Sequence, residues 1–160
     1  MVIVWQTKIM RQFILVFDRS IIRHLQKLEI PLARTAIFIV YFWFGALKLI
    51  GASPAGPLVR ELFQKTVPLP IPFATFYDFF ALFEMAIGII FLIRGWERLA
   101  ILLLGLHLFT TVLPLLLLPH ITWQKWLAPT LEGQYIIKNI LIVAAAVVIG
   151  SKLVPLKKVN

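Results

Sequence analysis

Residues 99–124, LAILLLGLHLFTTVLPLLLLPHITWQ, form an unbroken run of 26 positions without Lys, Arg, Asp or Glu. A helix needs about 20 consecutive, mostly apolar residues to cross the hydrocarbon core of a bilayer. Uncharged runs of this length are typical of transmembrane segments rather than soluble domains. The stretch therefore predicts a membrane-spanning helix, and the remaining residues are interpreted with lipid as their solvent.

The composition of the whole chain favours the same class of protein. Of its 160 residues, 61% are hydrophobic and only 14% are charged, as in membrane proteins. The 16 Lys and Arg residues outnumber the 7 Asp and Glu residues, but basic residues that flank spans commonly contact anionic lipid head groups. We therefore expect a single bundle whose partner is the lipid bilayer, and no nucleic-acid binding.

Three further apolar segments predict an all-α membrane protein with four transmembrane helices. The expected spans cover about residues 31–51, 73–93, 99–118 and 134–153, inside a bundle of residues 31–155. Pro31 suits the first turn of the first span, and Lys138 with Asn139 interrupts the fourth span near its start. In the fourth span, Ala146 and Gly150 form a small-residue pair that permits close helix contact.

Residues 1–30 predict an amphipathic basic helix ahead of the bundle. Their apolar side chains recur at spacings of three and four, and basic side chains fill the other faces. Such a helix is suited to the head-group layer of a membrane, and a partner-binding helix is the alternative interpretation. At the other end of the chain, residues 156–160 form a basic tail.

The two longer connections carry turn and anchor signals. In residues 52–74, Ser53–Pro54 or Gly56–Pro57 can open a short helix, and the Pro-rich end favours an extended segment. This connection is interpreted either as a lid over one mouth of the bundle or as a stiff connector. In residues 119–133, Trp123 and Trp126 predict an aromatic anchor at the membrane interface.

Lys and Arg are distributed unevenly between the two sides of the predicted bundle. Eleven lie in the segment through Arg34, in the turn 94–98 and at the C-terminal end, whereas three lie in the loops 53–73 and 119–133. Because Lys and Arg concentrate on the cytoplasmic side of membrane proteins, both termini are expected in the cytoplasm. The predicted location is a multi-pass position in the cytoplasmic (inner) membrane.

Seven polar side chains in the spans form the candidate ligand-binding pocket: Lys48, Asp78, Glu84, His107, Thr111, Lys138 and Asn139. In the predicted orientation they lie in the outer half of the membrane or near its midplane. A charge at that depth is costly unless it is paired or hydrated, so such residues tend to face the bundle interior or a cavity. We therefore expect Glu84 to face Lys48 or Lys138 in an outward-opening pocket.

A structural interpretation of the same residues stays open. A buried ion pair can fix helix register without binding any ligand, and a lone His107 is expected to form a hydrogen bond between helices. No second His or carboxylate falls at a helical metal-binding spacing from it. The chain also has no Cys, which excludes thiol chemistry. The sequence therefore predicts no metal site and no tightly bound cofactor, and it indicates no catalytic residue.

Over about residues 31–153, several short motifs resemble the DoxX-like family of integral membrane proteins. They are Arg34 with WFGALK at 43–48, SPA at 53–55, Glu84 with Gly88, and GQYIIKN at 133–139, in that order. This family is related to the small subunit of thiosulfate:quinone oxidoreductase. The resemblance implies four membrane helices, a link to redox or sulfur metabolism, and contact with quinone.

Two function classes follow. The leading hypothesis is a redox-associated membrane subunit, of oxidoreductase type, with a pocket for quinone or another small molecule and a redox partner protein or a second copy of the chain beside it. The alternative is a non-catalytic membrane binding protein, such as an assembly factor, a receptor or a small transporter. A Phe-rich second span could wall a quinone ring, or could simply pack in the core or face lipid; its residues are Phe76, Phe79, Phe80 and Phe83.

Overall fold

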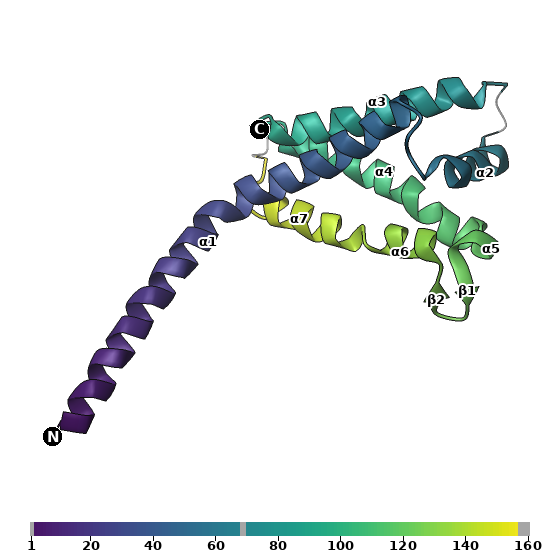
Figure 1. Ribbon diagram of the computed structural model, residues 1–160. Coiled ribbons are helices and arrows are strands. Elements are labelled where there is room, and N and C mark those ends of the chain that lie inside the picture. The colour runs from purple at the N-terminus through teal and green to yellow at the C-terminus, as the bar shows by residue number, and fades with distance from the viewer. Residues whose placement is uncertain (1, 68–69, 157–160) are drawn as a thin grey trace. The chain divides into compact units, whose positions relative to one another are not determined.

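The computed structural model describes residues 2–67 and 70–156, and in this part of the chain every element is helical except one short hairpin. Pro68 and residues 157–160 of the expected basic tail lie outside the described residues. The chain divides into two units, Met1–Leu32 and Ala33–Asn160. The second unit holds the bundle, and it is the part that positions the candidate site (Figure 1).

The first helix, α1, runs from Val2 to Leu49 without interruption. Pro31, the expected start of the first span, lies inside this helix and does not begin a separate one. Proline has no amide hydrogen, so the carbonyl of the residue four positions earlier, Lys27, loses its helical donor. Both residues are exposed, which leaves that carbonyl open to solvent or lipid head groups and lets the helix persist.

Four helical segments are long and apolar enough to cross a membrane: Ile14–Leu49 of α1, Phe73–Leu92, Glu97–Leu117 and Leu131–Gly150. The second and third of these are α3 and α4. The fourth consists of α6 (Leu131–Ile137) and α7 (Ile140–Gly150), with the expected break at Lys138–Asn139 between them. The protein is thus all-α, with four long helices that could span a bilayer.

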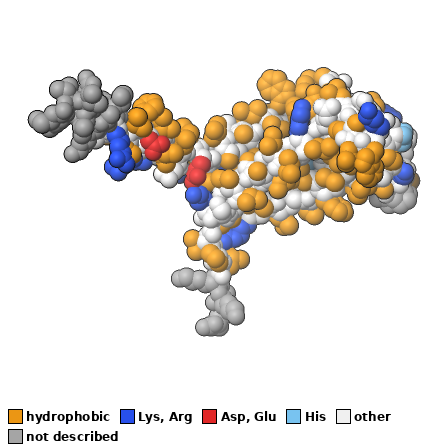
Figure 2. Space-filling view, turned by 90° about the horizontal axis from the view of Figure 1, so that it is seen from below, with side chains coloured by type: hydrophobic (Ala, Val, Ile, Leu, Met, Phe, Trp, Pro, Cys, Tyr) orange, Lys and Arg blue, Asp and Glu red, His pale blue; other side chains and the backbone are white. Residues whose placement is uncertain are grey.

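In the second unit, α4 packs against α3 on one side and along α6 and α7 on the other (Figure 1). The buried core is apolar and includes Ile37 of α1, Ile87 and Phe91 of α3, Leu104 of α4 and Ile149 of α7. Large apolar side chains also cover much of the outer surface (Figure 2). Such a surface is unfavourable in water and matches a lipid environment.

The C-terminal part of α1 meets α3 at two glycines, one on each helix. A side chain at Gly45 would come within 2.7 Å of the Ala81 carbonyl, and one at Gly88 within 3.2 Å of the Phe38 carbonyl. A methyl group at Gly45 would force its neighbours to move, and one at Gly88 would be tightly packed. Small residues let helix backbones approach closely in membrane proteins, and here they bring the polar face of α1 against α3.

A short helix and a hairpin close the end of the bundle where α3 begins and α4 ends. Helix α2 (Gly56–Thr66) opens at Gly56–Pro57, one of the two expected starts, and its Phe63 packs on Phe76 with ring centroids 4.6 Å apart. The Lys65 ammonium donates to the Leu117 carbonyl at 2.7 Å. Helix α2 is therefore fastened to both α3 and α4.

After α4, the chain forms a single turn, α5 (Pro119–Thr122), and an antiparallel hairpin of β1 (Trp123–Lys125) and β2 (Ala128–Pro129). Thr130 then caps α6, since its hydroxyl oxygen accepts the Gly133 amide at 3.2 Å. A side chain at Gly133 would lie 2.1 Å from the Thr122 carbonyl and 2.9 Å from the Pro129 side chain of β2. The hairpin is therefore held tightly against the start of α6.

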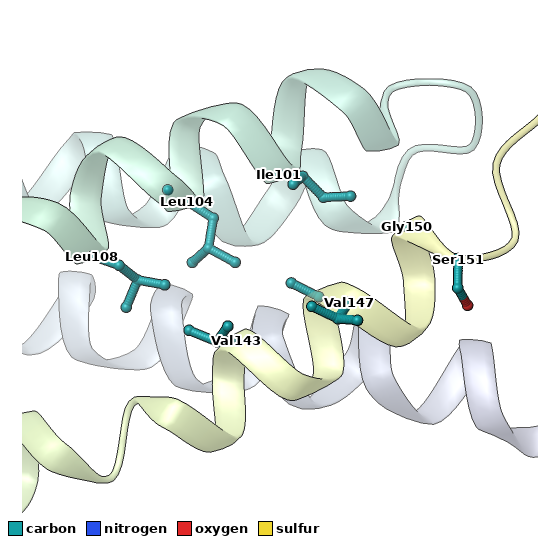
Figure 3. A pocket seen from close by; sticks show the side chains of 9 residues that line it. Ile101, Leu104, Leu108, Val143, Val147, Gly150 and Ser151 are labelled. Carbon is teal, nitrogen blue, oxygen red and sulfur yellow. The ribbon is translucent and has the colours of Figure 1, made fainter. Parts of the chain in front are cut away.

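An apolar groove of about 570 Å³ separates parts of α4 and α7 (Figure 3). Ile101, Leu104 and Leu108 line it from α4, and Val143 and Val147 line it from α7. The helices come closer at Gly150, where an added side chain would sit 3.4 Å from Ile101. The groove offers almost no polar group to a ligand, so polar chemistry has to be sought elsewhere in the bundle.

Candidate functional site

The polar interior of the bundle is a hydrogen-bonded cluster made by α1, α3 and α4. It consists of Tyr41 and Lys48 on α1, Glu84 on α3 and His107 on α4. Each of these four residues is at most 7% exposed. Tyr41 and Lys48 lie seven positions apart, so they share one face of α1, and the glycine contacts turn that face toward α3. We call these four residues the buried cluster.

Glu84 is the centre of the buried cluster, because each of its carboxylate oxygens has a different partner. The Lys48 ammonium donates to Oε2 at 2.6 Å, and the imidazole Nε2 of His107 lies 3.0 Å from Oε1. Lys48 also donates to the Phe44 carbonyl at 3.5 Å. A buried carboxylate without partners would be strongly destabilising, whereas this one has an opposite charge and a ring nitrogen in contact.

The partners of His107 determine which of its ring nitrogens carries hydrogen. An ionised carboxylate only accepts hydrogen bonds, so Nε2 must donate to Glu84. In the neutral ring Nδ1 is then an acceptor, and it lies 3.1 Å from the Tyr41 hydroxyl, which donates to it. The Thr111 hydroxyl sits 3.2 Å from the same nitrogen and donates to the His107 carbonyl at 2.9 Å. With Lys48 protonated and Glu84 ionised, the cluster has no net charge.

Aromatic rings pack directly against the buried cluster. Phe80 stacks on the His107 ring with centroids 5.2 Å apart and planes inclined by 21°, and Phe83 lies at 6.3 Å. The Lys48 ammonium is 5.8 Å from the Phe80 centroid. Exclusion of water strengthens the electrostatic interactions inside the cluster. Two of the four Phe residues considered as ring walls therefore do border polar groups.

A cavity of about 580 Å³ opens beside the buried cluster at the end where α2 lies. Lys48 lines this cavity and also contacts Glu84, so it connects the two. The loop after α1 contributes Ser53, α2 contributes Arg60, and α3 contributes Phe73, Tyr77 and Asp78. This volume is in the range of small-molecule sites. We call this space the mouth cavity.

A second ion pair lies closer to the N-terminus of α1. Its Arg34 is 14 residues before Lys48, or about 21 Å along the helix at 1.5 Å per residue. Arg34 of α1 pairs with Glu97 at the start of α4, and it also donates to the Phe91 carbonyl at 3.4 Å. It does not line the mouth cavity. This pair ties α1 to the turn between α3 and α4, a structural role that separates it from the buried cluster.

The structure brings together most of the predicted pocket residues. Lys48, Glu84, His107 and Thr111 meet around the buried cluster, and Asp78 lines the mouth cavity. Lys138 and Asn139 do not join them, contrary to expectation. Lys138 is exposed with its ammonium 5.2 Å from the Tyr135 ring, and Asn139 donates to the Tyr135 carbonyl at 3.4 Å. Both residues instead contact Tyr135, next to the break between α6 and α7.

Several residues of the site were not among those predicted, including Tyr41, Arg60 and Tyr77. The spacing of seven from Arg34 to Tyr41 to Lys48 was visible in the sequence and could have indicated the inward face of α1. No comparable signal marked Arg60 or Tyr77, because their place depends on how α2 folds back over α3.

Among the described residues, no three His, Asp or Glu side chains are grouped so as to hold a metal ion. No family model, curated protein or solved structure matches this chain.

Proposed function

We propose that this protein is a multi-pass membrane protein that binds the polar head of a small molecule in the mouth cavity, against the buried cluster. The observation that carries the proposal is the placement of Lys48, which lines the cavity while its ammonium is paired with Glu84. Ionisable groups inside membrane spans are costly and commonly mark ligand or proton pathways. A merely structural pair has no need of an adjoining cavity.

The resemblance to DoxX-like proteins supplies the ligand class of the leading proposal, a quinone bound by a redox-associated subunit. A quinone carbonyl would accept a hydrogen bond from Lys48, and Phe73 at the cavity wall would contact its ring. The buried cluster would hold a proton on His107 or Lys48 close to that carbonyl. Electrons would come from a bound cofactor or a partner protein, since this chain has no Cys.

The second proposal is the non-catalytic binding protein, and one specific observation favours it. Charges of both signs, Arg60 and Asp78, line the mouth cavity, and a neutral quinone would pair with neither. A receptor or small transporter for a charged molecule would use both. The two proposals share the site and differ in the ligand.

The proposal also includes the orientation of the protein in the membrane. The bias of Lys and Arg toward the termini and the 94–98 turn favours cytoplasmic ends. The mouth cavity, at the opposite ends of α1 and α3, would then open to the outer side of the cytoplasmic membrane.

Mass spectrometry of protein purified in a mild detergent tests the binding proposal. We expect a small molecule at about one per chain, retained by the Lys138→Met variant and lost by Lys48→Met. Both variants remove one Lys from a candidate span, so they match in charge and composition. A recovered quinone supports the redox subunit, and a recovered charged metabolite or lipid supports the binding protein. Equal retention by both variants would place the ligand elsewhere.

A further inference from the structure

Three polar groups that line the mouth cavity form no hydrogen bond or ion pair in the described part of the chain. They are the Tyr77 hydroxyl, the Arg60 guanidinium and the Asp78 carboxylate. By contrast, the Lys48 ammonium at the same cavity already donates to Glu84 and to the Phe44 carbonyl, which leaves one of its three N–H groups for a ligand. The three unpartnered groups therefore define most of what this cavity offers to a ligand.

The Tyr77 hydroxyl is the buried member of this set. It is enclosed by protein and makes no hydrogen bond, and a side chain at Gly56 would lie 3.6 Å from it. A buried hydroxyl left without a partner costs about 1–3 kcal/mol. Native structures rarely retain such a group unless water or a ligand satisfies it. Tyr77 lines the mouth cavity, so a molecule bound there would shift this side chain in order to accept from its hydroxyl.

Arg60 and Asp78 add opposite charges. The Arg60 guanidinium is held 4.2 Å from the centroid of the Phe73 ring, which orients its donors without neutralising them. Asp78 lies in the second turn of α3 and is exposed, so its carboxylate is open to a ligand or to water. No ion pair joins the two groups in the residues described. The cavity thus presents a cation and an anion that do not satisfy one another.

We infer that the ligand of the mouth cavity is a small zwitterion, with an anionic oxygen group for Arg60 and an ammonium group for Asp78. This inference rests on the proposed binding function and narrows its ligand. An anion alone would be repelled by Asp78, a cation alone by Arg60, and a neutral ring would leave both unpaired. Arg60 and Tyr77 both pack on the Phe73 ring, so an anionic oxygen group at Arg60 would lie beside the Tyr77 side chain.

The cavity lies where such molecules are found. It is bordered by the last residues of α1 and the first turns of α3, and the ends of membrane spans lie at the head-group level. Two sources share the required chemistry: a free zwitterion such as an amino acid, and the head group of phosphatidylethanolamine. Both carry an anionic oxygen group and an ammonium group on one short carbon chain.

Isothermal titration of the detergent-purified full chain with O-phosphoethanolamine tests the inference. We expect saturable binding, and at least about tenfold weaker binding of ethanolamine or inorganic phosphate, because each offers one charged contact in place of two. The lipid source is tested by native mass spectrometry in phosphatidylglycerol nanodiscs containing a minor share of phosphatidylethanolamine. Enrichment of phosphatidylethanolamine on the protein identifies the lipid, and binding of the soluble probe alone identifies a free zwitterion.

Matched variants show whether the named residues form the site. Arg60→Gln and Asp78→Asn should each weaken zwitterion binding about tenfold or more, whereas Lys125→Gln and Glu132→Gln, the same charge changes at exposed positions outside the cavity, should leave it unchanged. Tyr77→Phe should weaken binding without lowering thermal stability. If the Tyr77 hydroxyl does not contact the ligand, Tyr77→Phe should instead bind the zwitterion as tightly as the unmodified protein.

The failure of this inference is distinguishable from failure of the proposed function. Suppose that a soluble quinone binds, that Lys48→Met abolishes this binding, and that Arg60→Gln and Asp78→Asn leave it unchanged. The proposed binding function then stands, and the inferred zwitterionic ligand is wrong. If ethanolamine or phosphate binds as tightly as O-phosphoethanolamine, the zwitterion is likewise wrong. If neither the zwitterions nor the quinone bind, both proposals are overturned.

Discussion

At the scale of single residues, the bundle is organised by one carboxylate. Glu84 accepts from Lys48 and His107, and the second nitrogen of His107 accepts from Tyr41. Removing one member of such a cluster leaves another group buried without its partner, which costs more than removing both partners together. The energetic signature of the cluster is therefore coupling between residues rather than the effect of any one substitution.

A double-mutant cycle measures that coupling. Glu84→Gln and Lys48→Met should each lower the free energy of unfolding by about 3–5 kcal/mol, and the double variant by clearly less than their sum. The cycle of Glu84→Gln with Lys138→Met should be additive within about 0.5 kcal/mol, since Lys138 is exposed. Reversible unfolding in mixed SDS micelles supplies the free energies. Coupling to Lys138, or none to Lys48, would contradict the observed pairing.

The sequence predicted this pairing only in part. Depth along a span follows from residue number, so Glu84, His107 and two lysines were expected at similar levels. The choice between Lys48 and Lys138 depends on the rotation of each helix about its axis, which residue spacing within a single helix does not determine. The turn at Lys138–Asn139 changes that rotation for the fourth span, and the Gly45 and Gly88 contacts set it for α1.

At the scale of elements, the pairing of α1 with α3 determines whether the buried cluster can form. The two helices touch through backbone at Gly45 and Gly88. The 2.6 Å contact between Lys48 and Glu84 crosses this same interface between α1 and α3. Helix packing and the chemistry of the site are therefore linked through two residues that have no side chain.

Substitution of these glycines tests the link. Gly45→Ala should lower the free energy of unfolding by about 1–3 kcal/mol, because its methyl group would meet Met85 at 2.6 Å and the Ala81 carbonyl at 2.7 Å. Gly105→Ala on α4 is the control: nothing lies within 4 Å of its added carbon, and Ala favours the helix by up to about 1 kcal/mol. Equal effects at the two positions would argue against close packing of α1 on α3.

Helices with long apolar runs were predicted well from the sequence. Elements whose conformation depends on tertiary contacts were predicted poorly. The spans beginning at Phe73 and near Leu99 were expected within a few residues, and Gly56–Pro57 was one of two expected starts for α2. The hairpin at Trp123–Pro129 was not expected, because its turn places Leu127 at a φ of 57°, a conformation that Leu rarely adopts. Its contacts with α6 through Gly133 hold it in place.

At the scale of the whole molecule, four long apolar helices and an apolar surface describe a protein built for a bilayer. The bias of basic residues then predicts which side faces the cytoplasm. In this Cys-free chain, single cysteines at Ser53 and Ser151 test the orientation. An impermeant thiol reagent added to intact cells should label position 53 and spare position 151. Labelling of position 151 with protection of position 53 would contradict the predicted orientation and indicate the inverted one.

The central claim is that the buried cluster and the mouth cavity form a ligand site, and that the cluster is more than a device for helix register. The chain provides a matched comparison, because Glu84 and Glu97 each pair with a basic residue of α1, near opposite ends of the bundle. Glu84→Gln and Glu97→Gln make the same chemical change in two ion pairs. Only the first pair adjoins the mouth cavity.

The most direct measurement is the amount of co-purified small molecule per folded protein in these two variants, with folded protein counted as the monodisperse fraction in size-exclusion chromatography. We predict that Glu97→Gln lowers the yield of folded protein but retains about one small molecule per chain. Glu84→Gln should lose the small molecule from the protein that remains folded. Retention of the small molecule by folded Glu84→Gln, with loss only of yield, would contradict the claim and leave Glu84 as a structural residue.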